Sequence, residues 1–270
     1  MSILTNLSRA AAILAATFTA LAVTGCATKS GEGLLASSEV VAQLARESGE
    51  QVEAARFSRR QPDGPLSADW QPYIILPSKP RTEYKLVSTD AGVALEANAE
   101  NSASGMYRRM RVDPARHPVL EWRWRVANLI PGANKRIASK EDSPARLIVS
   151  FHGDPEKLDF ADRAQMRLAK AVSGQALPYA TLMYVWSNTL PVGSVVDNPH
   201  TDRIRMIVVA SGADGVGEWR DYRRNVLEDY RRAFGEEPWD IVAVGVMTDT
   251  DNTRQKARCL YGDITFRRGR

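Results

Sequence analysis

Cysteine, histidine and familiar catalytic motifs are scarce in this sequence. The 270 residues include only 2 cysteines and 3 histidines, so neither a disulfide framework nor a histidine-rich metal centre is expected. GxSxG, HExxH, CxxC and Walker A motifs are absent. The common routes to hydrolysis, zinc chemistry and nucleotide binding therefore have no signature here.

A strong excess of one charge is also lacking. The chain has 36 Lys+Arg and 32 Asp+Glu, a net charge of +4, whereas nucleic-acid-binding proteins gather cations on one face with few acids between them. We therefore expect no nucleic-acid partner. Hydrophobic residues make up 44% of the chain, and a chain of this length can bury a large core without disulfides.

The apolar run at residues 10–23 is too short to span a membrane. It follows Arg9 and is typical of the apolar region of a signal peptide. The run ends in Leu-Ala-Val-Thr-Gly-Cys at residues 21–26, which resembles a bacterial lipobox. We expect cleavage before Cys26 and attachment of acyl chains such as palmitate to its sulfur, enough for stable anchoring. The alternative is an ordinary signal peptide cleaved near residues 20–22.

Three segments follow from this interpretation. Residues 1–25 are predicted to be a lipoprotein signal peptide, residues 26–58 the lipid anchor and a tether with a helical spacing at 36–58, and residues 59–270 one β-sandwich domain. Ala27 follows the lipidated cysteine instead of Asp, so we expect an outer-membrane lipoprotein facing the periplasm. Cys259 then has no partner, and its alternating context predicts a buried, inert thiol.

Short apolar alternations separated by Pro, Gly and Asp predict β structure after residue 61. The expected strands are 83–88, 93–98, 119–126, 145–151, 180–187, 203–211, 241–248 and 257–267. Helical spacing predicts two helical insertions, at 159–172 and 217–234. Several strands follow one another without an intervening helix, which favours a mainly β fold, an antiparallel two-sheet β-sandwich of the jelly-roll type.

Aromatic residues in two of these strands are candidate ligand-binding residues. Trp122 and Trp124 share one face of their strand, and Tyr184, Trp186 and Asn188 share a face if that strand continues. Exposed tryptophans form stacking platforms for sugar rings, and an amide supplies hydrogen bonds. The alternative for both groups is packing in the core.

The acidic turn after strand 241–248 is a candidate metal site. Asp249, Asp251 and Asn252 offer oxygen atoms, which Ca²⁺ prefers. The turn departs from an EF-hand loop, and its alternative is a turn that hydrogen-bonds its own backbone. No cofactor other than Ca²⁺ at Asp249 and Asp251 is suggested by the sequence.

Several motifs occur in an order that resembles one bacterial family. They are SASG at 102–105, VDP at 112–114, LEWRW at 120–124, DSPAR at 142–146, YVWSN at 184–188, RRAFGEEP at 231–238 and TDTDNT at 248–253. The family consists of secreted and lipid-anchored proteins known only as a domain of unknown function. The resemblance covers roughly residues 60–267 and implies an envelope location without an activity. Glu141 and Arg254 depart from the pattern, where Asp and Gly are common.

Three functions are compatible with these observations. The first is non-catalytic binding of a carbohydrate or another envelope component through the aromatic, amide and acidic residues. The second is a structural or assembly role with an envelope protein as partner, reached through residues 217–234 or the N-terminal segment. The third is a glycan-active hydrolase or lyase that uses Asp142, Asp249 or Asp251 as acid and base.

Overall fold

The computed structural model describes residues 38–173, 177–199 and 201–269. The chain divides into two units, Met1–Ser30 and Gly31–Arg270, and every element described below belongs to the second. Because all its strands and its core lie in that unit, a fragment of residues 31–270 retains every contact described here. The predicted signal peptide and Cys26 lie outside the described residues.

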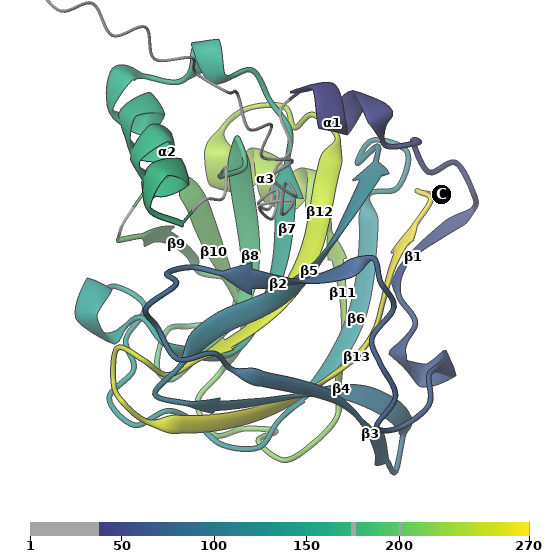
Figure 1. Ribbon diagram of the computed structural model, residues 1–270, viewed down its shortest axis with the longest axis vertical. Helices are drawn as coiled ribbons and strands as arrows, with labels where there is room; N and C mark the ends of the chain where they lie inside the picture. Colours follow the sequence, from purple (N-terminus) through teal and green to yellow (C-terminus); the bar gives the residue numbers. More distant parts are fainter. Residues whose placement is uncertain (1–37, 174–176, 200, 270) are drawn as a thin grey trace, which may run out of the picture. The chain divides into compact units, whose positions relative to one another are not determined.

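Two β-sheets pack face to face (Figure 1). The six-stranded sheet has the order β11 (Arg220–Asn225), β6 (Val119–Val126), β13 (Lys256–Arg267), β4 (Gly92–Glu100) and β3 (Glu83–Thr89), and β1 (Gln51–Ala55) also pairs with β13. The seven-stranded sheet has the order β2 (Trp70–Ile74), β5 (Ala103–Val112), β12 (Ile241–Asp249), β7 (Ser143–Phe151), β8 (Ala180–Ser187), β10 (Thr201–Ser211) and β9 (Val195–Asn198).

The predicted two-sheet, jelly-roll-like β-sandwich is confirmed. All eight expected strands are present with nearly the expected bounds, and β1, β2, β5, β9 and β11 were not predicted. Among the described strands, pairing is antiparallel except between β8 and β10, which are parallel. A parallel neighbour needs a crossover connection, and here the segment between β8 and β10, which contains β9, provides it.

The prediction of one helix at 217–234 is wrong in its first half. Residues Arg220–Asn225 form β11 and only Val226–Phe234 form a helix, α3. β11 extends the six-stranded sheet next to β6, where Tyr222 lies opposite Trp122. The Asn225 side chain then caps α3 by accepting from the Glu228 backbone N–H, and Gly235 ends the helix in the left-handed conformation.

The N-terminal helix is much shorter than the spacing at 36–58 indicated. α1 covers only Ser38–Gln43. Residues Gln51–Ala55 instead form β1, which hydrogen-bonds to β13 and buries Val52 and Ala54 in the core. The helix predicted at 159–172 is present as α2 (Phe160–Ser173). Short 3-10 helices occur at Phe57–Arg59, Ala138–Lys140 and Pro155–Lys157.

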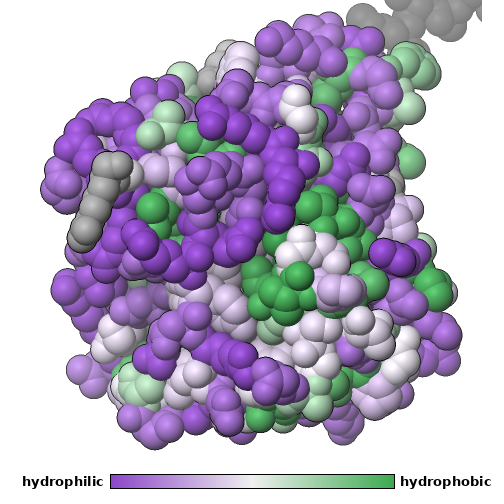
Figure 2. Space-filling model, turned by 180° about the vertical axis from the view of Figure 1, so that it is seen from behind, coloured by the Kyte–Doolittle hydropathy of each residue, from purple (hydrophilic) through white to green (hydrophobic). Residues whose placement is uncertain are grey.

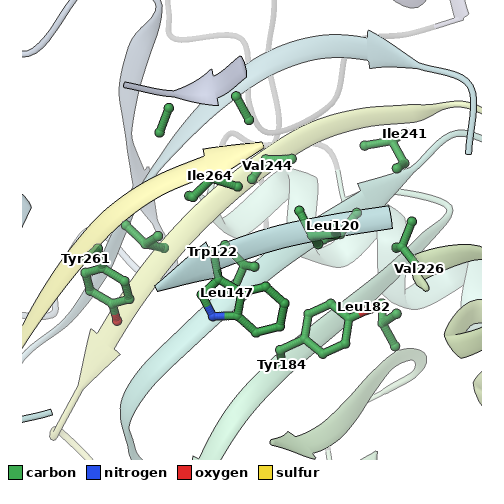
Figure 3. Close-up of a cluster of buried hydrophobic side chains, with 14 of the residues drawn as sticks. Leu120, Trp122, Leu147, Leu182, Tyr184, Val226, Ile241, Val244, Tyr261 and Ile264 are labelled. Atoms are coloured by element: carbon green, nitrogen blue, oxygen red, sulfur yellow. The ribbon is translucent and has the colours of Figure 1, made fainter. Parts of the chain in front are cut away.

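The main core fills the space between the sheets (Figure 3). In β6 the buried and less buried positions alternate over the whole strand, so Leu120, Trp122 and Trp124 point inward. They meet residues of the opposite sheet, among them Leu147 and Tyr184. Seen from behind, the surface is mostly hydrophilic with a patch of apolar residues near its middle (Figure 2). In the described part of the chain, every helix is too short or too polar to cross a bilayer.

Candidate functional site

The four aromatic candidates Trp122, Trp124, Tyr184 and Trp186 all lie buried in the core between the sheets. Trp122 stacks on Tyr222 with ring centroids 5.0 Å apart, and Trp186 donates from its indole nitrogen to the Gly212 carbonyl at 3.0 Å. The rings of the four candidates face the opposite sheet, because all four residues occupy inward-pointing positions of β6 or β8. The structure therefore corrects the sugar-platform prediction for these four residues, and core packing accounts for them.

Asn188 lies just after β8 and has a local structural contact. Its side-chain nitrogen donates to the Ile130 carbonyl at 2.6 Å, which ties the loop after β6 to the end of β8. Its side-chain oxygen is buried without a hydrogen-bond partner among the described residues. Asn188 therefore does not act together with Trp186, which lies in the core.

The acidic turn after β12 belongs to a buried ionic cluster that sequence reasoning did not foresee. Asp249, at the end of β12, accepts two hydrogen bonds from Arg146 of β7, at 2.9 and 2.8 Å, and a third from the Ser143 backbone at 3.0 Å. The Asp249 and Arg146 side chains are both almost completely buried. We call Lys135, Glu141, Asp142, Arg146, Asp249 and Asp251 the ionic cluster.

The remaining predicted residues of the turn join the same cluster. Asp251 forms an ion pair with Lys79. The Asn252 backbone donates to Asp142 at 3.1 Å, and its side chain donates to the Ala138 carbonyl at 3.1 Å. Asp142 also accepts from the Thr253 backbone at 2.7 Å. The backbone and side chains of the turn thus donate hydrogen bonds to residues 138–142 and hold the turn against them.

Burial dominates the protonation equilibria of the cluster. Burial and, to a smaller extent, the nearby Arg146 lower the pKa of Lys135 to about 7, against the opposing effect of the acids around it. Lys135 donates to the backbone carbonyls of Glu141 and Asp142. Burial also raises the pKa of Asp249 to about 6, against the effect of Arg146. Such shifts are common both at functional sites and in structural ion-pair networks.

The acids of the cluster can offer ligands to a metal ion. One carboxylate oxygen from each of Asp142, Asp249 and Asp251 lies within 4.8 Å of the others, a spacing that could hold a cation such as Ca²⁺. Each carboxylate also has a protein partner of its own, namely Thr253, Arg146 and Lys79. A metal ion would therefore have to compete with these donors. The same burial argues against Asp142 and Asp249 as an acid and base pair facing an open groove.

A pocket lies at the opposite end of β12, which spans nine residues or about 30 Å. It has a volume of about 430 Å³. We call it the Trp239 pocket, because the side chain of Trp239 is 46% exposed there. It is lined by Val41, Ala42, Arg46, Arg111, Asp113, Pro114, Ala115, His152, Leu227, Glu237, Pro238, Trp239 and Asp240.

Asp240 organises the polar side of the pocket. Two arginines from distant parts of the chain donate to its carboxylate, Arg46 at 2.6 and 2.9 Å and Arg111 at 2.6 Å. Arg46 follows α1 and Arg111 belongs to β5. Because both pair with Asp240, these contacts also fix the N-terminal segment to the sandwich. The hydrogen bond to Asp240 raises the pKa of Arg46, which keeps its charge at all relevant pH values.

The aromatic side of the pocket consists of Trp239 and His152. Their ring centroids are 5.3 Å apart, and the Lys157 amine lies 5.8 Å from the Trp239 ring. Burial lowers the pKa of His152, so the imidazole is neutral at neutral pH and offers one donor and one acceptor. The pocket therefore combines an exposed aromatic ring with fixed charged and neutral hydrogen-bonding groups.

Sequence reasoning missed this pocket. Trp239 immediately follows the RRAFGEEP motif but stands outside any predicted strand or helix. Arg111 lies in β5, which was not predicted, and Arg46 lies in a segment assigned to the tether. The usable signal was Trp239 itself, a large aromatic residue between Pro238 and Asp240 in a loop, where it has no strand neighbour to pack on.

Three solved structures have distant similarity to this chain. The chain shares 8% identity with a family 12 xyloglucanase from Bacillus licheniformis, with a TM-score of 0.43 over 81% of this chain and 100% of that one. With CtCBM11 it shares 10% identity, with a TM-score of 0.37 over 82% of this chain and 96% of that one. With the glycoside hydrolase domain of Spr0440, Endo-D from Streptococcus pneumoniae R6, it shares 9% identity, with a TM-score of 0.30 over 73% of this chain. The match covers 21% of that chain, so this chain spans about a fifth of its length. These similarities are too weak to carry an argument about function.

Comparison at the level of sequence gives one clear result. A search of curated proteins finds no significant match. The family described as "Protein of unknown function (DUF3047)" matches residues 68–265, which include all strands from β2 to β13 except the last two residues of β13. The sequence motifs had indicated a family of this kind, and the chain belongs to the DUF3047 family.

Proposed function

We propose that this protein is a lipid-anchored envelope protein that binds a carbohydrate, without catalysis, in the Trp239 pocket. The observation that carries the proposal is the exposed ring of Trp239 beside the Arg46, Arg111 and Asp240 network in a pocket of about 430 Å³. A pocket of this volume is within the range of small-ligand sites.

The chemistry of the pocket suits a sugar ring. The C–H face of a pyranose packs against an aromatic ring, and its hydroxyl groups need donors and acceptors held in fixed positions. Trp239 supplies the aromatic ring, Asp240 and His152 supply acceptors, and the two arginines supply donors. Because the arginines and Asp240 already neutralise one another in part, we expect a neutral glycan to bind better than a highly charged one.

The envelope location rests on the lipobox at residues 21–26. In this proposal Cys26 carries the acyl chains, and the domain faces the periplasm from the outer membrane. Residue 38, the first residue of α1, follows Cys26 by only twelve positions. Val41 and Ala42 of α1 line the Trp239 pocket, so the binding site would lie close to the membrane tether. Its ligand would then be an envelope glycan, with neutral oligosaccharides as the first probe and the charged soluble peptidoglycan fragments as the comparison.

A calorimetric titration of the 31–270 fragment with peptidoglycan fragments and neutral oligosaccharides tests this function. Loss of the stacking surface in Trp239→Ala is expected to weaken binding by about 2 kcal/mol, roughly thirtyfold in Kd. Trp219→Ala is the matched control, because Trp219 is also a partly exposed tryptophan, and it packs against Arg123 and Arg125 of β6 in the six-stranded sheet. Binding that Trp239→Ala leaves unchanged, or no binding across the panel, would refute the proposal.

A further inference from the structure

The outward face of α2 carries an apolar stripe. Phe160 is 77% exposed and Leu168 is 64% exposed, and Ala164, halfway between them, is exposed as well. Residues four apart lie on the same side of a helix, so the three side chains form one line. A surface helix normally turns its apolar side toward the core, whereas this apolar line of α2 faces outward.

The inward side of α2 does not need this stripe to hold the helix in place. Met166 is partly buried and packs against the main core. Asp162, which is also partly buried, has its pKa raised by that burial. The helix begins with the Asp159 side chain accepting from the Asp162 backbone N–H at 2.8 Å. Docking and capping thus use other residues, and the stripe is left for contact with something outside this fold.

The charges next to the stripe have one sign over most of the helix. From residue 163 to residue 173 the charged residues are Arg163, which pairs with Glu156 at 3.2 Å, and the exposed Arg167 and Lys170. The acids Asp159 and Asp162 lie at the N-terminal end, where they favour the helix dipole. An apolar stripe bordered by arginine and lysine matches a surface with anionic headgroups above hydrocarbon, which is the pattern of interfacial membrane-binding helices.

The position of α2 agrees with a membrane surface. α1 and α2 lie at the same end of the described domain (Figure 1). α1 is the point where the described chain begins, twelve residues after Cys26. Twelve residues span at most about 43 Å when fully extended. A lipid on Cys26 would therefore keep α1, and with it the end of the domain that bears α2, within about 43 Å of the bilayer.

We propose that α2 docks on the surface of an anionic phospholipid bilayer, with Phe160 and Leu168 inserted among the acyl chains and Arg167 and Lys170 at the headgroups. The lipid anchor delivers the domain to the membrane, and α2 fixes its orientation there. This inference uses the proposed anchor for delivery only and is independent of carbohydrate binding, so the two proposals can fail separately.

The test uses the 31–270 fragment, which has neither Cys26 nor its lipid. Leu168→Cys is labelled with an environment-sensitive fluorophore, because the remaining cysteine, Cys259, is buried. Vesicles of phosphatidylglycerol and phosphatidylethanolamine should shift the emission to the blue, and pure phosphatidylcholine vesicles should do so much less. Val192→Cys is the matched control, since Val192 is 63% exposed in the loop between β8 and β9 and its label should not respond.

A second variant measures the contribution of the stripe. Phe160→Ser in the labelled fragment should lower the partition coefficient for the anionic vesicles by about tenfold or more. No blue shift with these vesicles overturns the proposal, as does a partition coefficient that Phe160→Ser leaves unchanged. A blue shift without vesicles that grows with protein concentration identifies a second copy as the occupant. A blue shift without vesicles that is seen with a 27–270 fragment and not with the 31–270 fragment identifies residues 27–30 of the chain itself as the occupant. Either of these two results also overturns the proposal.

Discussion

Replacing Arg146 by alanine should destabilise the protein strongly. Arg146 makes two charge-assisted hydrogen bonds to Asp249, at 2.9 and 2.8 Å, and a third bond to the Glu141 carbonyl at 2.7 Å. Without Arg146, the carboxylate of Asp249 stays buried with no cation in contact, which typically costs about 3–5 kcal/mol. For a domain of this size that corresponds to a decrease in Tm of roughly 6–20 °C.

Urea unfolding of the 31–270 fragment measures this loss. The matched control is Arg231→Ala, because Arg231 also makes two bonds to one carboxylate, Glu237, at 2.8 and 2.9 Å, but both side chains are exposed. An exposed pair of this kind contributes about 0–1 kcal/mol. The double variant Arg146→Ala/Asp249→Ala should lose less stability than the two single variants together, because it leaves no buried charge in the pair.

The pH dependence sharpens the same test. Burial already raises the pKa of Asp249 to about 6 in the native protein, and loss of Arg146 should raise it further. A carboxyl group whose folded pKa lies above its unfolded value loses stability as pH rises through the folded pKa. The cost of Arg146→Ala should therefore be larger at pH 8 than at pH 5. If Arg146→Ala costs no more than Arg231→Ala at either pH, the description of a buried ion pair is refuted.

Two further predictions concern the same cluster. Burial lowers the pKa of Lys135 to about 7, so above pH 7 the unfolded chain holds a proton that the folded one has released, and the free energy of unfolding should rise with pH until the unfolded pKa near 10.4. Lys135→Met should remove this rise, and an unchanged pH profile in denaturant titrations would contradict it. Lys79 pairs with Asp251, one of the three possible metal ligands, so Lys79→Met should increase the thermal shift caused by millimolar Ca²⁺ relative to EDTA. An equal Ca²⁺ response in both proteins would show that Lys79 does not compete with a cation.

The aromatic residues show where prediction of the site ended. Alternation in β6 correctly placed Trp122 and Trp124 on one face, yet which of the two faces meets the other sheet depends on packing. The face with the tryptophans packs against the other sheet, so their rings are buried and cannot bind a sugar. For residues 217–234, the three- and four-residue spacing from Trp219 to Ala233 was compatible with a helix throughout, and pairing with β6 converted the first part into a strand.

The sandwich architecture, most strand bounds, α2 and the family were predictable from the amino-acid sequence, because alternation, turn residues and motifs are local properties of the chain. The ionic cluster and the Trp239 pocket form only in the folded protein. Arg146 and Asp249 are 103 positions apart, and the pocket joins residues from α1, β5, the end of β7 and the loop before β12. Such sites arise only when strand pairing between distant segments brings their side chains together, and no local pattern records that pairing.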